Sequence, residues 1–161
     1  MRKPLLSLVL AFLAASSAAS ADSNKACDLA TPAELEGLLG EAVKLTPQGA
    51  MEGGSICGGG NSKATVILRV ARARGSTADA AKAGAEIARK SGTQVDIQTF
   101  GPMTCSTMIP PDNLKGYGFN TTCAVTKDKS VAAIEVTSKK KADMVPIDKL
   151  KPVAEKMPSR F

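Results

Sequence analysis

The residues in this sequence that are most suited to metal binding or covalent chemistry contain sulfur. The segment "FGPMTCSTMIPP", residues 100–111, holds Met103, Cys105 and Met108 within six positions. Thiolate and thioether groups are the ligands that copper(I) prefers in proteins. Two chemistries are therefore open to this segment. It holds a soft metal, with Met51 as a further thioether ligand, or Cys105 forms one half of a disulfide.

The metal interpretation has a family pattern for comparison. "GPMTCSTM" superficially resembles the "GMTCxxC" loop of the heavy-metal-associated domains that carry copper(I). Here Met108 stands in place of the second cysteine, and Pro102 separates the glycine from the methionine. In those domains the loop opens a helix, whereas the prolines at 110–111 stop one. A copper site at Met51, Met103, Cys105 and Met108 is the alternative hypothesis.

The disulfide interpretation starts from two predicted strands, 103–109 and 117–125, on either side of the loop "PPDNLKG". If these strands pair as a hairpin, the midpoint between Cys105 and Cys123 falls in the middle of the loop, so the two cysteines stand opposite each other. Opposed Cα atoms in a non-hydrogen-bonded pair lie about 4.5 Å apart, which suits a disulfide. Four cysteines allow three pairings. We favour Cys105–Cys123 with Cys27–Cys57, each bridge contributing about 3–4 kcal/mol by chain entropy.

The N-terminal residues predict the compartment. Residues 1–21 have a positive start, an apolar run over 5–15 and an Ala-Ser-Ala cleavage pattern at 19–21, which are the features of a signal peptide. Cleavage leaves a single mature domain, residues 22–161. The apolar run is shorter than the roughly 20 residues that span a bilayer, so we expect no transmembrane segment after cleavage. A periplasmic or secreted location follows, where disulfides persist.

Composition excludes several classes of protein. The chain has no histidine, which excludes Ser-His-Asp, Cys-His and histidine–zinc chemistry. Loss of the two basic residues in the signal segment reduces the formal charge from +6 to +4. With one tyrosine and no tryptophan, the chain has few of the aromatic stacking partners of a nucleic-acid-binding protein, and we expect no cofactor. Ser138 and Lys141 match the S-x-x-K pattern of serine–lysine acyl-transfer enzymes without their companion motifs, a remote alternative.

Two helices are predicted in the first part of the chain. In "TPAELEGLLG", residues 31–40, Thr31 and Glu34 form a capping box and Gly40 ends the helix. The second, "TADAAKAGAEIARKSG", covers residues 77–92, and we expect its buried side to consist of alanines and Ile87. A last helix is expected at about 148–157, because Pro152 is tolerated only near a helix start.

The other segments predict strands. Residues 42–47 and 62–72 are expected to be strands joined by a glycine-rich loop, 48–61, and further strands are expected at 93–100, 103–109, 117–125 and 131–138. The fold class is therefore α+β, a mostly antiparallel β-sheet flanked by helices in an αβ sandwich with two disulfides.

One further segment carries a family resemblance. "CDLATPAELEGLLGEAV", with a second cysteine about thirty residues on, resembles small exported cell-envelope proteins and lipoproteins of unknown function, best represented in actinobacteria. Their pattern reads Cys, a spacer, Leu-x-Thr-x-x-Glu, then Leu-Gly before a strand, and "VPIDKLKPVAEKM" is similar to their terminal helix. Some related exported proteins resemble the extrinsic photosystem subunit fold, a sheet sandwiched by helices. The resemblance implies that fold and no catalytic residue, and this chain departs from it by lacking a lipid-accepting cysteine.

Together these observations favour a non-enzymatic exported binding or interaction protein. Its partner would be an unidentified protein or envelope component. The candidate contact surfaces are the glycine-rich segment 48–61 and the loop 109–117, which contains Tyr117.

We predict that the exported protein begins at Asp22 and contains no free thiol. Two disulfides make its intact mass about 4 Da lower than that of the reduced chain. Mass spectrometry before and after reduction measures both values. Four free thiols in the exported form would contradict the disulfide interpretation and favour the metal site.

Overall fold

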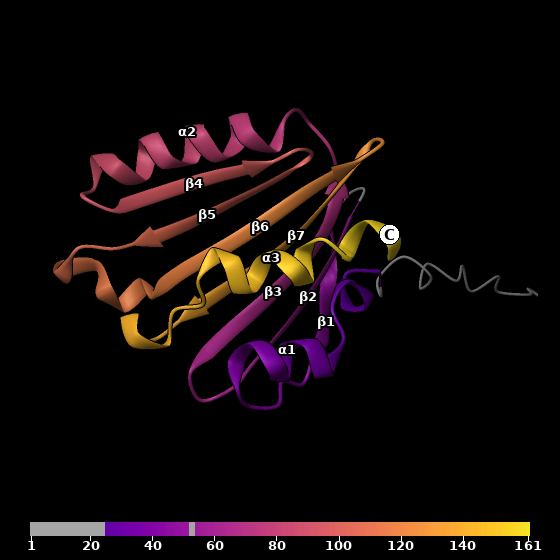
Figure 1. The fold of residues 1–161 in the computed structure, drawn as a ribbon, viewed down its shortest axis with the longest axis horizontal. Coiled ribbons are helices and arrows are strands. Elements are labelled where there is room, and N and C mark those ends of the chain that lie inside the picture. Colours follow the sequence, from indigo (N-terminus) through magenta and orange to yellow (C-terminus); the bar gives the residue numbers. More distant parts are fainter. Residues whose placement is uncertain (1–24, 52–53) are drawn as a thin grey trace, which may run out of the picture.

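The computed structural model describes residues 25–51 and 54–161, so the predicted signal peptide lies outside the described residues. The described chain forms one seven-stranded antiparallel sheet in the order β1-β2-β3-β7-β6-β5-β4, with helices on both faces (Figure 1). The strands are β1 Thr46–Met51, β2 Gly54–Gly60, β3 Ala64–Arg72, β4 Gln94–Phe100, β5 Met103–Ile109, β6 Phe119–Lys127 and β7 Ser130–Ser138; the helices are α1 Pro32–Leu39, α2 Thr77–Lys90 and α3 Ile147–Ala154. The predicted α+β class is confirmed.

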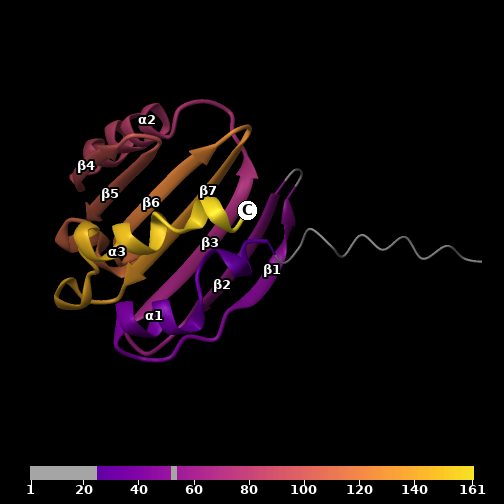
Figure 2. The same ribbon diagram turned by 45° about the vertical axis from the view of Figure 1, so that its right-hand side comes forward.

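The two faces of the sheet are covered unequally. We call the face that carries Leu68, Cys123 and Ile134 the core face, because α3, α1 and two short 3-10 helices pack against it (Figure 2). The other face, which carries Arg69, Thr104 and Ala124, is the groove face. Among the described helices, α2 packs on it, over β4, β5 and β6. The hydrophobic core therefore lies on one side of the sheet.

A row of buried residues crosses five strands of the core face. Each member stands directly opposite the next, and all are fully buried: Cys57, Leu68, Ile134, Cys123 and Cys105. Cys105 and Cys123 are bridged across their strands with Cα atoms 4.0 Å apart, and Cys27 reaches Cys57 from the 3-10 helix Cys27–Leu29 with Cα atoms 5.1 Å apart. Both predicted disulfides are confirmed. The sulfur atoms are part of the core.

The first helix forms as its local sequence predicts. The Thr31 side chain accepts a hydrogen bond from the Glu34 amide at 3.2 Å, and the Glu34 carboxylate accepts one from the Thr31 amide at 2.9 Å. Gly40 ends the helix with φ at 72°, a left-handed conformation that suits glycine.

Glu34 also joins this helix to the C-terminal segment. Arg160 donates from its two terminal nitrogens to the two carboxylate oxygens of Glu34, at 2.7 and 2.9 Å, and Lys156 donates at 2.9 Å. Arg160 further donates to the Leu29 carbonyl at 2.8 Å. The hydrogen bonds from Arg160 are the main reason why the pKa of Glu34 lies well below its ordinary value. This carboxylate therefore holds α1 against the C-terminal segment of the chain.

The glycine-rich segment is not the loop that its composition predicts. Most of it belongs to β1 and β2, and β2 pairs with a strand on each side. A Cβ atom at Gly58 would collide with the Gln48 side chain, and one at Gly59 with the Lys44 carbonyl. Glycine is disfavoured in strands. Here the absence of a side chain allows the segment 44–48 to approach β2 closely, and the backbone groups of β2 are hydrogen-bonded to β1 and β3.

Ile87 does not lie on the buried side of α2, where the sequence predicts it. Its side chain is 71% exposed, whereas Ala85 is fully buried. Two residues along an α-helix correspond to a rotation of about 200°, so the face that buries Ala85 must turn Ile87 away from the sheet. The helix otherwise begins at Thr77 as expected, with Ser76 as its cap.

The last helix is shorter and begins earlier than expected. It runs from Ile147 to Ala154, and Pro152 lies in its last turn instead of near its start. Proline lacks the amide hydrogen that would bond to the Asp148 carbonyl, which favours an early end. Met157 falls in a separate 3-10 helix, Met157–Ser159, and is still fully buried. In the same way, most of the predicted loop between β5 and β6 forms the 3-10 helix Asp112–Tyr117.

We expect Glu34→Gln to lower the free energy of unfolding by about 1–3 kcal/mol at pH 7, because hydrogen bonds to a charged acceptor are replaced by weaker ones. Since the folded state depresses the pKa of Glu34, its contribution is complete above the ordinary value of 4.5 and is lost as the pH falls below it. Urea unfolding at several pH values measures this effect. The wild type should lose more stability than Glu34→Gln on acidification.

The matched control is Glu36→Gln, which removes an exposed carboxylate from the same helix. Glu36 takes part in no ion pair among the described residues. This variant should follow the wild-type pH profile. A wild-type profile identical to that of Glu34→Gln would contradict the assigned role of the ion pair.

Candidate functional site

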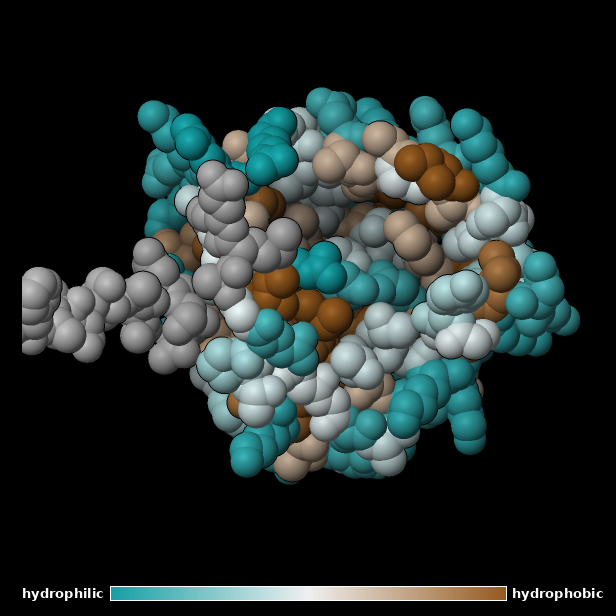
Figure 3. All heavy atoms as spheres, turned by 180° about the vertical axis from the view of Figure 1, so that it is seen from behind, coloured by the Kyte–Doolittle hydropathy of each residue, from teal (hydrophilic) through white to brown (hydrophobic). Residues whose placement is uncertain are grey.

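A groove lies on the groove face, between α2 and the open part of the sheet (Figure 3). Its volume is about 940 Å³, within the range of roughly 300–1,000 Å³ that is common for ligand sites. One wall is α2, the floor is β5 and β6, and the far side is formed by β2, β3 and the segment 73–76 that leads into α2. We call this space the helix–sheet groove.

The groove exists because the residues that face it are small. Ala80, Ala81 and Gly84 form the wall on α2. Below them, the groove-face positions of β5 and β6 carry Thr104, Ser106, Thr122 and Ala124. None of these side chains is long enough to fill the space between a helix and a sheet, which pack about 10 Å apart when large residues interdigitate.

The strand register gives the groove a direction. Thr104, Ser106 and Met108 alternate along β5, and Thr104 to Met108 spans roughly 13 Å at the usual rise per residue. Thr104 lies at the end where α2 begins, because its hydroxyl is 3.2 Å from that of Thr77. At that end the groove is lined by Arg72 and Arg74, and Met108 lines the other. Arginine residues and Asp79 therefore border one end of the groove, and a methionine borders the other.

A free hydroxyl lies along the floor. The Ser106 side chain is only 8% exposed, and no described residue forms a hydrogen bond with it. The neighbouring hydroxyls differ, since Thr104 contacts Thr77 and Thr122 donates to Asn120 at 2.8 Å. Ser106 can therefore offer a donor or an acceptor to a bound molecule.

The residues that line the groove carry more positive than negative charge. Its lining includes three arginines and one carboxylate, Asp79. Arg69 forms an ion pair with Glu135 at 3.4 Å. Within the described residues, neither Arg72 nor Arg74 has an ion pair or a side-chain hydrogen bond. Arg72 lies four positions from Leu68 on β3, so its side chain is on the core-face side of the strand, whereas Arg69 projects onto the groove face.

The structure does not bring the sulfur residues of the metal hypothesis together. Cys105 is in a disulfide. Met103 is buried on the core face, whereas Met108 lies on the groove face, because five positions along a strand change the face. Met51 is the last residue of β1, and its side chain lies outside what the structure describes. Across residues 25–51 and 54–161, no three acidic or cysteine side chains gather as metal ligands.

The other candidate residues are placed as follows. Tyr117 ends the 3-10 helix after β5 and is 81% exposed, as a contact residue requires, but it does not line the groove. Ser138 is fully buried and donates to the Asp143 carbonyl at 2.9 Å. Lys141 forms no hydrogen bond with it among the described residues. The S-x-x-K residues therefore do not form a reactive pair here.

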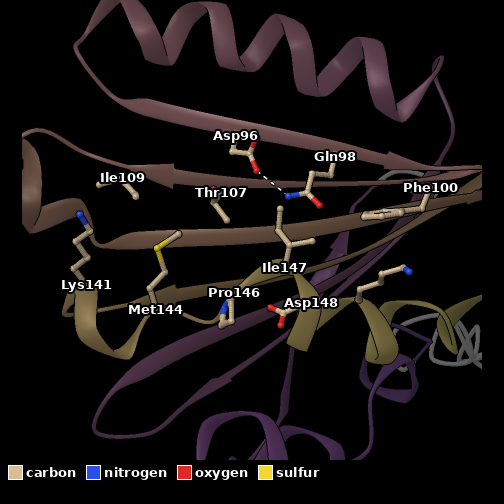
Figure 4. Close-up of a pocket in the computed structure, with 11 residues that line it drawn as sticks. Asp96, Gln98, Phe100, Thr107, Ile109, Lys141, Met144, Pro146, Ile147 and Asp148 are labelled. Carbon is tan, nitrogen blue, oxygen red and sulfur yellow. Dashed lines mark hydrogen bonds between the residues drawn. The ribbon is translucent and has the colours of Figure 1, made fainter.

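A second cavity of about 710 Å³ lies on the core face, between β4, β5 and the start of α3 (Figure 4). Gln98 donates to the Asp96 carboxylate at 2.9 Å, and the Lys151 ammonium lies 4.5 Å from the centre of the Phe100 ring and forms an ion pair with Glu155 at 3.4 Å. The other polar lining residues, Thr107, Lys141 and Asp148, have no side-chain hydrogen bond or ion pair among the described residues. This cavity is smaller than the helix–sheet groove, and its two lysines are balanced by two carboxylates, so it is the weaker candidate.

Comparison with protein-family models, curated proteins and solved structures found no match for this chain. Among the described helices, none has the length and apolar character needed to cross a membrane. The site must therefore be interpreted from its own geometry.

Sequence reasoning missed the groove. Its signal is an alanine- and glycine-rich helix in front of strands whose alternate residues are Thr, Ser and Ala, a pattern that is equally typical of a helix packed closely on a sheet. The arginines at 69, 72 and 74 are close in sequence, and all three border the groove, but the sequence does not show the cavity that they border.

Proposed function

We propose that this protein is a non-enzymatic, exported binding protein that takes up a small, largely apolar ligand in the helix–sheet groove. The observation that carries the proposal is a groove of about 940 Å³ bounded by α2 and the sheet. Binding sites of this kind combine apolar walls with a few polar groups that orient the ligand. Here the polar groups are the Ser106 hydroxyl and the Arg69 side chain on the groove face.

Apolar surface provides the driving force. Ile56, Ala71 and Val131 line the groove together with the alanines of α2. A ligand that covers these residues removes apolar surface from water, which contributes about 25 cal/mol per Å². The sheet therefore presents outside its core an apolar surface that a ligand can cover.

The site is held in shape from the opposite face of the sheet. Cys105 lies between Thr104 and Ser106 on β5, and its disulfide fixes β5 against β6 below the floor. A floor that keeps its shape loses little conformational freedom on binding, and this favours affinity. The Cys105–Cys123 disulfide thus supports a preformed site.

The lining supports binding more than catalysis. Asp79 is its one carboxylate, and the rest of its polar groups are hydroxyls and guanidinium groups. Neither a nucleophile beside a base nor a pair of carboxylates is present among these residues. Export is supported by the two disulfides and by the signal-peptide features of residues 1–21.

We expect Gly84→Phe to abolish binding by filling the groove. A side chain at this position meets no atom within 4 Å, and the helical backbone of Gly84 accepts other residues. The measurement is the fluorescence of the neutral apolar probe N-phenyl-1-naphthylamine during titration with protein. The affinity of Gly84→Phe should be at least about tenfold weaker than that of the wild type, or about 1.4 kcal/mol.

Gly84→Ala is the matched control, since it improves helix propensity by up to about 1 kcal/mol while adding one methyl group. It should bind the probe like the wild type and unfold at higher urea concentration. No probe binding by the wild type, or equal binding by Gly84→Phe, would contradict the proposed site.

A further inference from the structure

We infer that the free edge of β4 is a dimer interface, at which β4 pairs antiparallel with β4 of a second copy of this chain about a two-fold axis through Ile97. This β4 interface is separate from the helix–sheet groove. Its basis is a strand edge that lacks the usual protection and has self-complementary charges beside it.

The two edges of the sheet differ. β1 forms one edge, and its pairing with β2 is interrupted by a bulge between Pro47 and Gly49. Prolines and bulges are devices that keep an edge strand from pairing with another chain. β4 forms the other edge, has neither proline nor lysine, and pairs with β5 along all seven of its residues without a break. β4 is therefore the edge that can accept a further strand.

The outward backbone groups of β4 are identified by a side-chain contact. Arg89 donates to the Val95 carbonyl at 3.0 Å, so this carbonyl points away from β5. Backbone groups at alternate positions of a strand point to the same side, and those of Ile97 and Thr99 therefore also point outward. Among the described residues, no side chain or loop backbone bonds to these two. Pairing about Ile97 would join each Thr99 amide to the Val95 carbonyl of the second copy.

The side chains of β4 suit this two-fold pairing. Asp96 would face Gln98 of the second copy, so that a carboxylate meets an amide and not another carboxylate. The two groups already form such a contact within the chain, where Gln98 donates to Asp96 at 2.9 Å. On the other face, β-branched side chains would stand opposite each other, a favourable arrangement in a sheet.

Helix α2 adds a second layer beside this edge. Lys82, Glu86 and Arg89 are three or four residues apart and therefore share one side of the helix. The hydrogen bond from Arg89 to Val95 places this side above the free edge of β4. Gly84 borders the groove and is two residues from Lys82, a rotation of about 200°. One side of α2 therefore faces the groove and the other faces the β4 interface.

The position of the axis relative to α2 follows from its contact with β4. The helix ends shortly before β4 begins and lies along it, so the two run antiparallel (Figure 1). From Val95 to Ile97 the strand rises roughly 7 Å, which equals about four or five residues of an α-helix. The axis therefore passes close to position 84, which is midway between Lys82 and Glu86.

This placement makes the charges of α2 self-complementary. Lys82 would face Glu86 of the second copy, and Glu86 would face its Lys82. Both side chains are exposed, and neither has an ion pair among the described residues. Because α2 lies above β4 and β5, a strand spacing of about 4.8 Å would put the two copies of α2 about 10 Å apart. Packed helices have a similar separation.

One contact opposes dimerisation. In the dimer, the Val95 carbonyl would exchange the Arg89 side chain for the Thr99 amide of the second copy. Arg89 therefore competes with the added strand. We expect Arg89→Ala to dimerise about two- to fivefold more tightly than the wild type, and a weaker dimer would overturn the proposed register.

The main experiment measures the dimer dissociation constant of the exported chain by sedimentation equilibrium at several protein concentrations. We expect Thr99→Pro to weaken the dimer at least about tenfold. Proline removes an outward amide of β4 and leaves the β4–β5 ladder intact, as it does in other edge strands. Thr99→Ala is the matched control, because it keeps the amide, and it should dimerise like the wild type.

A charge exchange tests the interface without a proline. Lys82→Glu should weaken the dimer about three- to tenfold at low salt, because like charges would then face each other. Lys82→Glu/Glu86→Lys should restore it, since opposite charges face each other again. Lys44→Glu is the control for net charge. This exposed residue lies beside β2, far from β4 in the strand order, and its change should leave the dimer intact.

Amide hydrogen exchange locates the contact. The amides of Ile97 and Thr99 should exchange more slowly as the protein concentration rises, because the second copy holds them in hydrogen bonds. A monomer at every concentration, a dimer that Thr99→Pro retains, or protection confined to other amides overturns the inference. So does a double charge variant that stays as weak as Lys82→Glu. None of these outcomes affects the proposed ligand site, because none of these side chains lines the groove.

Discussion

The strand register that sets Cys57, Leu68, Ile134, Cys123 and Cys105 opposite one another is the constraint on which the rest of the structure depends. Side chains alternate between the faces of a strand. Burial of this row therefore places every neighbouring residue on the groove face. A slip of one position would exchange the two faces, and the Cys105–Cys123 bridge prevents it between β5 and β6. The floor of the groove is thus a consequence of the core.

The unequal covering of the sheet explains why one face keeps a cavity. Large buried residues lie on the core face, where α3 contributes Ile147, Leu150 and Val153. The groove face meets a helix of small residues, in which Ala85 is the one that is fully buried. A helix whose sheet-facing side chains are all small cannot fill the space above a twisted sheet. The hydrophobic core therefore lies on one face of the sheet, and the cavity lies on the other.

Electrostatic contacts follow the same division. Glu34 accepts hydrogen bonds from Arg160, Lys156 and the Thr31 amide, so one carboxylate holds together a helix start and the C-terminal segment. On the other face, Arg69 is paired with Glu135 at 3.4 Å in a partly exposed ion pair, and pairs of this kind contribute little to folding.

Local signals in the sequence alone determined several features correctly. The capping box of Thr31 and Glu34 and the end of the helix at Gly40 follow from spacing over a few residues. The Cys105–Cys123 pair follows from hairpin symmetry, and Cys27–Cys57 is the pair that then remains. Tertiary structure decided the rest, since it depends on partners distant in the chain. The glycine-rich segment forms strands because β2 pairs with β1 on one side and with β3 on the other. Ile87 is exposed because α2 turns the opposite side, with Ala85, toward the sheet. The groove arises only where these distant elements meet, because a cavity is a property of packing and has no local signal.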